Sequence, residues 1–151
     1  MMQKTLSKEI SFKGNALHTG EVVKVDLIPS AENTGIVFIR TDLENAEVPA
    51  LAKYVNRTDR QTILQNGNAS VGTVEHLMAS LYALGIDNLR VELNGSEVPI
   101  LDGSAAPLVD LILEAGMEEQ SVEKNFYVLE ETFTFKDEEG SEIMALPSDE
   151  F

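Results

Sequence analysis

Glu75 and His76 are neighbours at the start of the segment TVEHLMASLYAL, residues 73–84. An imidazole can bind a divalent metal, and zinc lowers the pKa of its bound water toward about 7. A neighbouring carboxylate can then accept a proton while the resulting hydroxide attacks a carbonyl. The pair is therefore compatible with metal-dependent hydrolysis, with His76 as a ligand and Glu75 as the general base.

The same two residues also have a purely structural interpretation. A glutamate in the first turn of a helix suits the helix dipole and can cap free N–H groups, and His76 could be an ordinary hydrogen-bonded histidine. Neither HExxH nor HxxEH is present, because Gly72 stands where the second motif needs a histidine. A catalytic zinc takes about three protein ligands, but the chain has two histidines, His18 and His76, and no cysteine. Spacing alone leaves both interpretations open.

An amphipathic helix is predicted for residues 73–84, with Gly85 as its stop. One stripe of this helix is expected to face the core: Val74, Leu77, Met78, Leu81, Tyr82 and Leu84. The opposite face is small and nearly uncharged: Glu75, His76, Ala79, Ser80 and Ala83. Such a face indicates that another surface packs closely against it.

The remaining pattern predicts an α+β fold in which a small β-sheet is covered on one face by two α-helices. Period-two alternation and short apolar runs predict strands at 23–27, 36–40, 89–93 and 97–101, the last two as a hairpin about Asn94-Gly95. Residues 41–60 are expected to be irregular, with a surface loop at 56–62. A second helix is predicted over 105–115 with Ser104 as its N-cap. Asp102-Gly103-Ser104 is interpreted as a turn rather than a phosphate site, because Asp102 would repel phosphate.

The end of the chain differs from the rest in composition. Residues 1–120 are predicted to form one domain, followed by a polar linker at 121–125. Residues 126–151 are predicted to form a hairpin that begins a second domain, most of which this chain does not contain. The alternative is that the hairpin extends the first sheet, since two strands alone are marginally stable.

The acidic composition excludes several classes of partner. The chain has 26 acidic and 11 basic residues in 151, for a net charge of −15, which argues against nucleic acid and against an anionic membrane surface. No apolar run approaches the roughly 20 residues of a membrane span, and the first residues lack the apolar core of a signal peptide. A cytoplasmic location is expected.

Three segments together resemble a known family: GNALHTG (14–20), TDRQTIL (58–64) and TVEHLMASLYALGIDNLRVELNGSEVPILDGSAAPLVDLI (73–112). In sequence and separation they resemble the zinc-dependent UDP-3-O-acyl-N-acetylglucosamine deacetylases of Gram-negative lipid A biosynthesis, over about the first 120 residues. Ala16 departs from the family, which usually has glycine there. The resemblance implies hydrolysis of the acetamide of UDP-3-O-acyl-N-acetylglucosamine to acetate and a free amine, the committed step of that pathway.

The resemblance also implies roles for individual residues. The family has two similar domains with the active site between them, so His76 would be the one Zn²⁺ ligand from the first domain and Glu75 the general base. Gln61 and Thr62 would border the substrate passage, although a solvated loop is the simpler interpretation. His18 is expected to have a structural role near the site. The 151 residues alone are expected to bind zinc weakly and to show no hydrolysis.

Two other interpretations remain. The chain could be a stand-alone binding or scaffold domain with the same fold and no chemistry, in which case more charge is expected around Ala79, Ser80 and Ala83. It could also self-associate by burying the same helix face between two copies.

Overall fold

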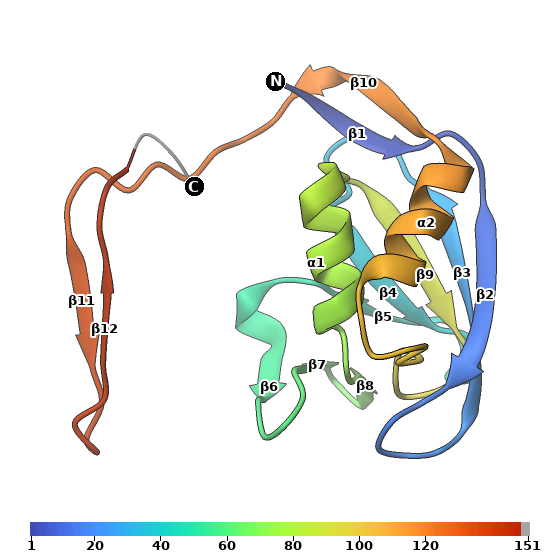
Figure 1. The fold of residues 1–151 in the computed structure, drawn as a ribbon, viewed down its shortest axis with the longest axis horizontal. Helices are drawn as coiled ribbons and strands as arrows, with labels where there is room; N and C mark the ends of the chain where they lie inside the picture. Colours follow the sequence, from blue (N-terminus) through green and yellow to red (C-terminus); the bar gives the residue numbers. More distant parts are fainter. Residues whose placement is uncertain (149–151) are drawn as a thin grey trace.

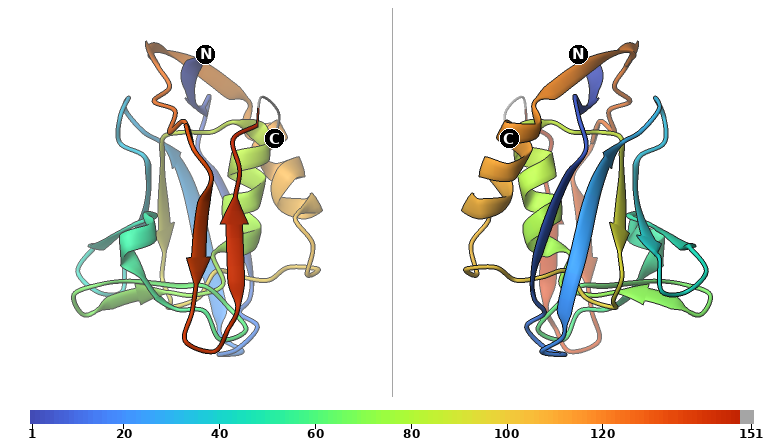
Figure 2. Two further views of the ribbon diagram at one scale, coloured as in Figure 1. Left: turned by 90° about the vertical axis from the view of Figure 1, so that its left-hand side faces the viewer. Right: turned by 90° about the vertical axis from the view of Figure 1, so that its right-hand side faces the viewer.

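The structure, a computed structural model, describes residues 1–148 and centres on a five-stranded mixed sheet (Figure 1). In spatial order its strands are β2 (Ile10–Asn15), β3 (Val22–Pro29), β9 (Leu89–Leu93), β4 (Ile36–Arg40) and β5 (Ala46–Pro49). Neighbouring strands are antiparallel except β4 and β9, which are parallel. Helices α1 (Glu75–Leu84) and α2 (Ala106–Ala115) lie on one face of this sheet (Figure 2). The predicted α+β class and its one-sided helical layer are confirmed.

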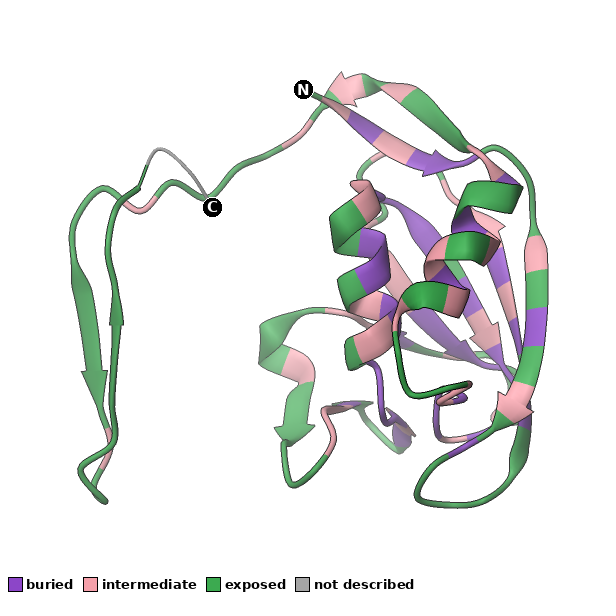
Figure 3. Ribbon diagram, in the orientation of Figure 1, coloured by how far each residue is buried: buried purple, intermediate pink, exposed green. Residues whose placement is uncertain are grey.

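The core lies between the sheet and the two helices (Figure 3). The period-two alternation of β3 places Val23, Val25 and Leu27 on the covered face, and all three are buried. Leu77 and Leu81 of α1 are also buried. Burying one such side chain stabilises the fold by about 1.5–3 kcal/mol, so this interface fixes the helix, and with it the first turn, on the sheet.

The buried stripe of α1 is rotated relative to the predicted stripe. Tyr82 was expected in the core but is 69% exposed, whereas Ser80 was expected on the open face and is 1% exposed. The stripe is rotated because α1 has two neighbours: the sheet on one side and α2 on another. Burial of the Ser80 hydroxyl costs little because it donates a hydrogen bond to the His76 carbonyl oxygen at 2.8 Å. The exposed face of α1 consists of Glu75, Ala79, Tyr82 and Ala83.

The end of α1 agrees with the prediction, whereas the start of α2 differs from it. Gly85 ends α1 in the left-handed conformation, with φ of 72°, as expected of a glycine stop. The N-cap of α2 is Ala105 rather than Ser104. Ser104 accepts a hydrogen bond from the Ala106 N–H at 3.2 Å, and Asp102 accepts one from the Ser104 N–H at 2.8 Å. The segment 102–104 is therefore a turn that leads into the helix.

The predicted hairpin of residues 89–93 and 97–101 is wrong. Strand β9 is already paired on both edges, with β3 and with β4, so it has no free edge for residues 97–101. Residues 97–101 instead run past the start of α1, where Glu97 forms an isolated parallel bridge with Gly72. The Val98 N–H donates to the Gly72 carbonyl oxygen at 3.0 Å.

Residues 41–60 are more regular than predicted. They contain β5 and the short 3-10 helix Ala52–Tyr54, and they enter a second sheet with the order β6-β7-β8. Its strands are β6 (Val55–Arg57), β7 (Ile63–Asn66) and β8 (Ala69–Val71). The loop at 58–62 connects β6 to β7, and β8 leads directly into the turn before α1.

The polar segment after α2 is also a strand. β10 (Met117–Glu123) pairs antiparallel with β1 (Met2–Leu6), so residues 121–123 of the predicted linker are part of a two-stranded sheet. The polar composition did not predict this strand, because its partner is the N-terminal segment, more than 100 residues away in the chain.

β11 (Phe133–Lys136) and β12 (Glu142–Ala145) form the predicted C-terminal hairpin. It is a separate two-stranded sheet and does not extend the first one. All its strand side chains are exposed. The last part of the predicted second-domain segment, residues 149–151, lies outside the described residues. Within residues 1–148, neither α-helix is long and apolar enough to cross a bilayer.

Candidate active site

The turn between β8 and α1 positions the two candidate chemical groups. Thr73 has φ of 55°, in the left-handed region that a β-branched residue rarely adopts. Such a conformation costs about 1–3 kcal/mol and persists only where the surroundings impose it. Here the Thr73 hydroxyl donates a hydrogen bond to the Glu97 carboxylate at 2.8 Å. The chain therefore turns sharply before Glu75 and His76, which form the first turn of α1.

The His76 side chain is half-buried. Neither of its ring nitrogens has a hydrogen-bond partner among residues 1–148, and no unpartnered polar side-chain atom in that part of the chain is buried. The ring nitrogens are thus accessible from outside the domain. The sequence also allowed His76 to be an ordinary hydrogen-bonded histidine of the domain. The structure does not show such hydrogen bonds to its ring within residues 1–148.

Glu75 is exposed, and its carboxylate accepts a hydrogen bond from the backbone N–H of Thr62. The capping contact considered for Glu75 is not formed, because the carboxylate contacts the loop at 58–62 rather than the free N–H groups of its own helix. Its charge in the first turn still suits the helix dipole. The contact with the loop brings Thr62, predicted to border the substrate passage, against the candidate general base.

Gln61 contacts the turn between β8 and α1 at two residues, Gly72 and Thr73. Its side-chain oxygen lies 3.2 Å from the Thr73 hydroxyl oxygen. A Cβ atom on Gly72 would overlap that Gln61 oxygen, so the absence of a side chain at position 72 leaves the space that Gln61 occupies. The amide of Gln61 is thereby held beside the turn that leads into α1.

We expect Gly72→Ala in the full-length protein to displace Gln61 without unfolding the domain. The clashing atom is the end of a flexible side chain, and the backbone at Gly72 does not require a positive φ. If Gln61 borders the substrate passage, kcat/KM should fall about 10-fold, since a displaced polar contact costs on the order of 1 kcal/mol. Steady-state kinetics and the melting temperature would test this together. An unchanged kcat/KM would contradict a substrate-contacting position for Gln61.

Glu97 is a buried carboxylate that connects the candidate residues. It is 2% exposed. It accepts hydrogen bonds from three consecutive backbone N–H groups: Leu17 at 3.1 Å, His18 at 3.0 Å and Thr19 at 3.0 Å. Burial of Glu97 by itself would raise its pKa, but hydrogen bonds from the Thr73 hydroxyl and from the His18 and Thr19 N–H groups outweigh burial and hold the pKa below its usual value.

This lowered pKa predicts an acid-sensitive contribution to stability. The unfolded chain binds the Glu97 proton more readily than the folded chain does. The contribution is therefore fully present above the unfolded pKa of roughly 4.3 and is lost as the pH falls through the lower folded value. Urea unfolding of the full-length protein and its Glu97→Gln variant should show a stability difference that shrinks between pH 6 and pH 3. A difference that stays constant over this range would contradict the prediction.

Two sets of hydrogen bonds involve four of the five sequence-predicted site residues, and the adjacent positions Gln61 and Thr62 connect the sets along the chain. Glu75 contacts Thr62, Gln61 contacts Thr73, and Thr73 contacts Glu97, which holds the backbone of His18. The His18 side chain is exposed and outside this network. His76 follows Glu75 directly on α1.

Sequence reasoning missed Thr73 and Glu97. No local signal marked Glu97, since its loop partners are 78 to 80 residues earlier in the chain.

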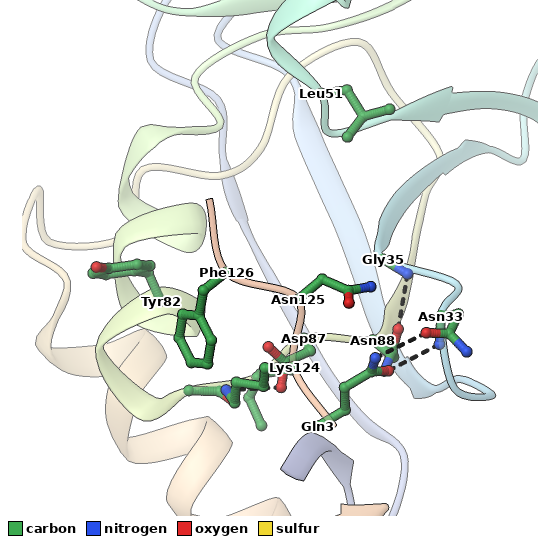
Figure 4. Close-up of a pocket in the computed structure, with 12 residues that line it drawn as sticks. Gln3, Asn33, Gly35, Leu51, Tyr82, Asp87, Asn88, Lys124, Asn125 and Phe126 are labelled. Carbon is green, nitrogen blue, oxygen red and sulfur yellow. Dashed lines mark hydrogen bonds and ion pairs between the residues drawn. The ribbon is translucent and has the colours of Figure 1, made fainter. Parts of the chain in front are cut away.

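A cleft of about 620 Å³ lies elsewhere, at the C-terminal end of α1 (Figure 4). None of the five predicted site residues lines it. Five of its polar side chains bond to one another: Asn88 donates to Gln3 at 2.8 Å, Gln3 donates to Asn33 at 2.9 Å, and Lys124 pairs with Asp87 at 2.8 Å. These bonds hold the protein structure together, so we place the candidate chemistry at the first turn of α1.

The described residues do not assemble a complete metal site. Residues 1–148 contain no group of three or more His, Asp or Glu side chains arranged to hold an ion. The fold and site thus define an α+β domain that presents a carboxylate and an imidazole on adjacent positions of one helix.

Comparison with known proteins identifies the family. The family model described as UDP-3-O-acyl N-acetylglycosamine deacetylase (LpxC) matches residues 3–151. The chain therefore belongs to the UDP-3-O-acyl N-acetylglycosamine deacetylase family.

Curated relatives agree with this assignment. The chain is 51% identical over 136 residues to the UDP-3-O-acyl-N-acetylglucosamine deacetylase of Myxococcus xanthus, a match that covers 89% of this chain and 43% of that protein. It is 45% identical over 150 residues to the deacetylase of the same name from Chromohalobacter salexigens, covering 99% of this chain and 49% of the relative. It is also 45% identical over 151 residues to the bifunctional enzyme LpxC/FabZ of Chlorobaculum tepidum, covering 99% of this chain and 32% of the relative. The chain thus spans between a third and a half of the relatives' length.

Proposed function

We propose that the full-length protein containing this chain hydrolyses the acetamide of UDP-3-O-acyl-N-acetylglucosamine, releasing acetate in the cytoplasm as a step of lipid A biosynthesis. The observation that carries the proposal is the accessible His76 ring beside the exposed Glu75 carboxylate, on the first turn of a helix, in a member of this family. A metal-binding side chain and a carboxylate able to act as general base are two of the groups that metal-assisted amide hydrolysis uses.

The donor set fits one ligand position of a zinc site. Zinc accepts imidazole nitrogen, and His76 offers ring nitrogens without a hydrogen-bond partner in the described part of the chain. When bound, the ion supplies Lewis-acid activation of water and of the amide carbonyl. The additional ligands expected of a catalytic zinc would come from the second domain.

Glu75 has the properties of a general base. It is exposed, it projects from a helix fixed by Leu77 and Leu81, and its carboxylate is oriented by the Thr62 N–H. It can take a proton from the attacking water and later return it to the leaving amine. Gln61 and Thr62 lie beside it in the loop at 58–62, where they would contact the substrate.

A second domain would complete the site by packing on the exposed face of α1. That face carries Ala79, Tyr82 and Ala83, with Glu75 as its one charged residue. Small side chains allow a neighbouring element to approach closely, whereas a stand-alone scaffold domain would favour charge there. We propose that the first domain extends through β10 to Glu123, three residues beyond the predicted boundary at 120, because β10 pairs with β1. The residues after 125 would begin the second domain.

The direct test is an assay of the full-length protein from the same reading frame. Purified with zinc and given UDP-3-O-acyl-N-acetylglucosamine, it should release acetate and free amine in equal amounts, and a chelator should abolish the reaction. A zinc-loaded protein that releases no acetate would refute the proposal. The 151-residue chain alone should be inactive. A strictly monomeric mass of that chain in solution would remove the self-association alternative.

A further inference from the structure

Glu97 is a buried carboxylate that contacts two segments converging on the candidate site, the loop 17–19 and the turn at Thr73. Resting on the proposed function, we propose that Glu97 is a positioning residue, which holds the loop 17–19 and the turn before α1 in one fixed arrangement for catalysis. The loop carries His18, and the turn leads to Glu75 and His76.

Both carboxylate oxygens of Glu97 are used. Oε1 accepts from the Leu17 N–H at 3.1 Å, the His18 N–H at 3.0 Å and the Thr73 hydroxyl at 2.8 Å. Oε2 accepts from the Thr19 N–H at 3.0 Å and lies 3.2 Å from the His18 nitrogen. A buried charge is tolerated only when it is fully hydrogen-bonded. Glutamine could not replace it, because its NH₂ group would face N–H donors where the second oxygen now accepts.

The position of the loop depends on this carboxylate. The base of the loop is closed by backbone bonds from the Ala16 N–H to the Glu21 oxygen at 2.8 Å and from the Gly20 N–H to the Ala16 oxygen at 3.2 Å. Leu17, His18 and Thr19 lie between these bonds with exposed side chains, and their N–H groups all donate to Glu97. Without the carboxylate, these three residues would lose the contacts that orient them.

The other half of the arrangement is the turn at Thr73. The Thr73 hydroxyl has one proton to donate and two oxygens within reach. The Glu97 carboxylate oxygen is the nearer at 2.8 Å and is taken as the acceptor, and the Gln61 side-chain oxygen is at 3.2 Å. Thr73 holds its left-handed backbone conformation in the presence of this bond. Since Glu75 follows two residues later and contacts Thr62, a shift at Thr73 would move the base and its loop together.

The test is Glu97→Gln in the zinc-loaded full-length enzyme, with Glu47→Gln as the matched control. Glu47 is an exposed residue of β5, so its substitution makes the same charge change away from the site. We expect Glu97→Gln to lower kcat about 10- to 100-fold, which is the effect of losing hydrogen bonds to a charged group. KM should stay within about 3-fold of the wild-type value, and the zinc content should not change. Hydrogen exchange of the Leu17, His18 and Thr19 amides should become faster. The control should match the wild type in every measurement.

Other outcomes separate this inference from the proposed function. A Glu97→Gln enzyme with wild-type kcat, whether or not the amides of 17–19 exchange faster, would overturn the positioning role. A wild-type enzyme that is inactive on the sugar nucleotide would contradict the proposed function itself.

If Glu97→Gln does not fold, Thr73→Val provides the second variant. It leaves the carboxylate and its backbone bonds in place and removes only the hydroxyl donor. We expect kcat to fall about 3- to 10-fold, as for one lost hydrogen bond, and Thr73→Ser, which keeps the hydroxyl, to restore it to within about 2-fold. Wild-type kcat in Thr73→Val would overturn the proposal.

Discussion

Glu75→Gln in the full-length enzyme should reduce kcat by about 10²- to 10⁴-fold, the usual contribution of a general base. The substitution removes the basic oxygen but keeps a side-chain oxygen that can accept the Thr62 N–H. The loop at 58–62 should therefore stay in place. Because Glu75 is exposed, the melting temperature should change little.

Kinetics with the sugar nucleotide, together with zinc content, would check this expectation. KM and bound zinc should remain close to wild type, since the substitution leaves His76 and the loop at 58–62 intact. Glu47→Gln again provides a control for the loss of one acidic residue. If Glu75→Gln kept more than about a tenth of wild-type kcat, far above the level expected for a missing general base, another group would have to be the base.

His76→Ala should abolish activity by removing the metal. Loss of even an outer-shell partner typically lowers metal affinity 10- to 100-fold, so loss of a direct ligand should lower it by at least about 100-fold. The fold should persist, because no hydrogen bond to the His76 ring is lost within residues 1–148 and the backbone of α1 is fixed by Leu77 and Leu81.

Zinc content after dialysis, measured by elemental analysis, would check the role of His76. His18→Ala is the matched control, since it removes the other histidine of the chain, whose side chain is exposed. That variant should retain wild-type zinc content. Retention of zinc in His76→Ala would show that His76 is not a ligand, and equal zinc loss in both variants would mean that the loss is not specific to His76.

Several features of the fold followed directly from local sequence patterns. The strands β3, β4 and β9, the helix α1 and its end at Gly85 were predicted to within two residues. The segment TVEHL was predicted to place Glu75 and His76 at the start of α1, as found. These predictions succeeded because hydrophobic periodicity and glycine stops are properties of residues a few positions apart.

Other features depended on what each element packs against. The buried stripe of α1 included Ser80 and excluded Tyr82 because α2 covers that side of the helix. Residues 97–101 formed no hairpin because both edges of β9 were already occupied. The polar β10 was a strand because the N-terminal segment paired with it.

The fold class, helix α1 and the family of the chain could all be predicted from the amino-acid sequence. The buried position of Glu97, 24 residues after Thr73 and about 80 after the loop 17–19, became visible only in the folded chain, where it lies between that turn and that loop. The physical reason is that a carboxylate becomes a buried anchor through the N–H and hydroxyl groups that surround it. Those groups come from segments remote in the chain, and no local pattern specifies that they meet.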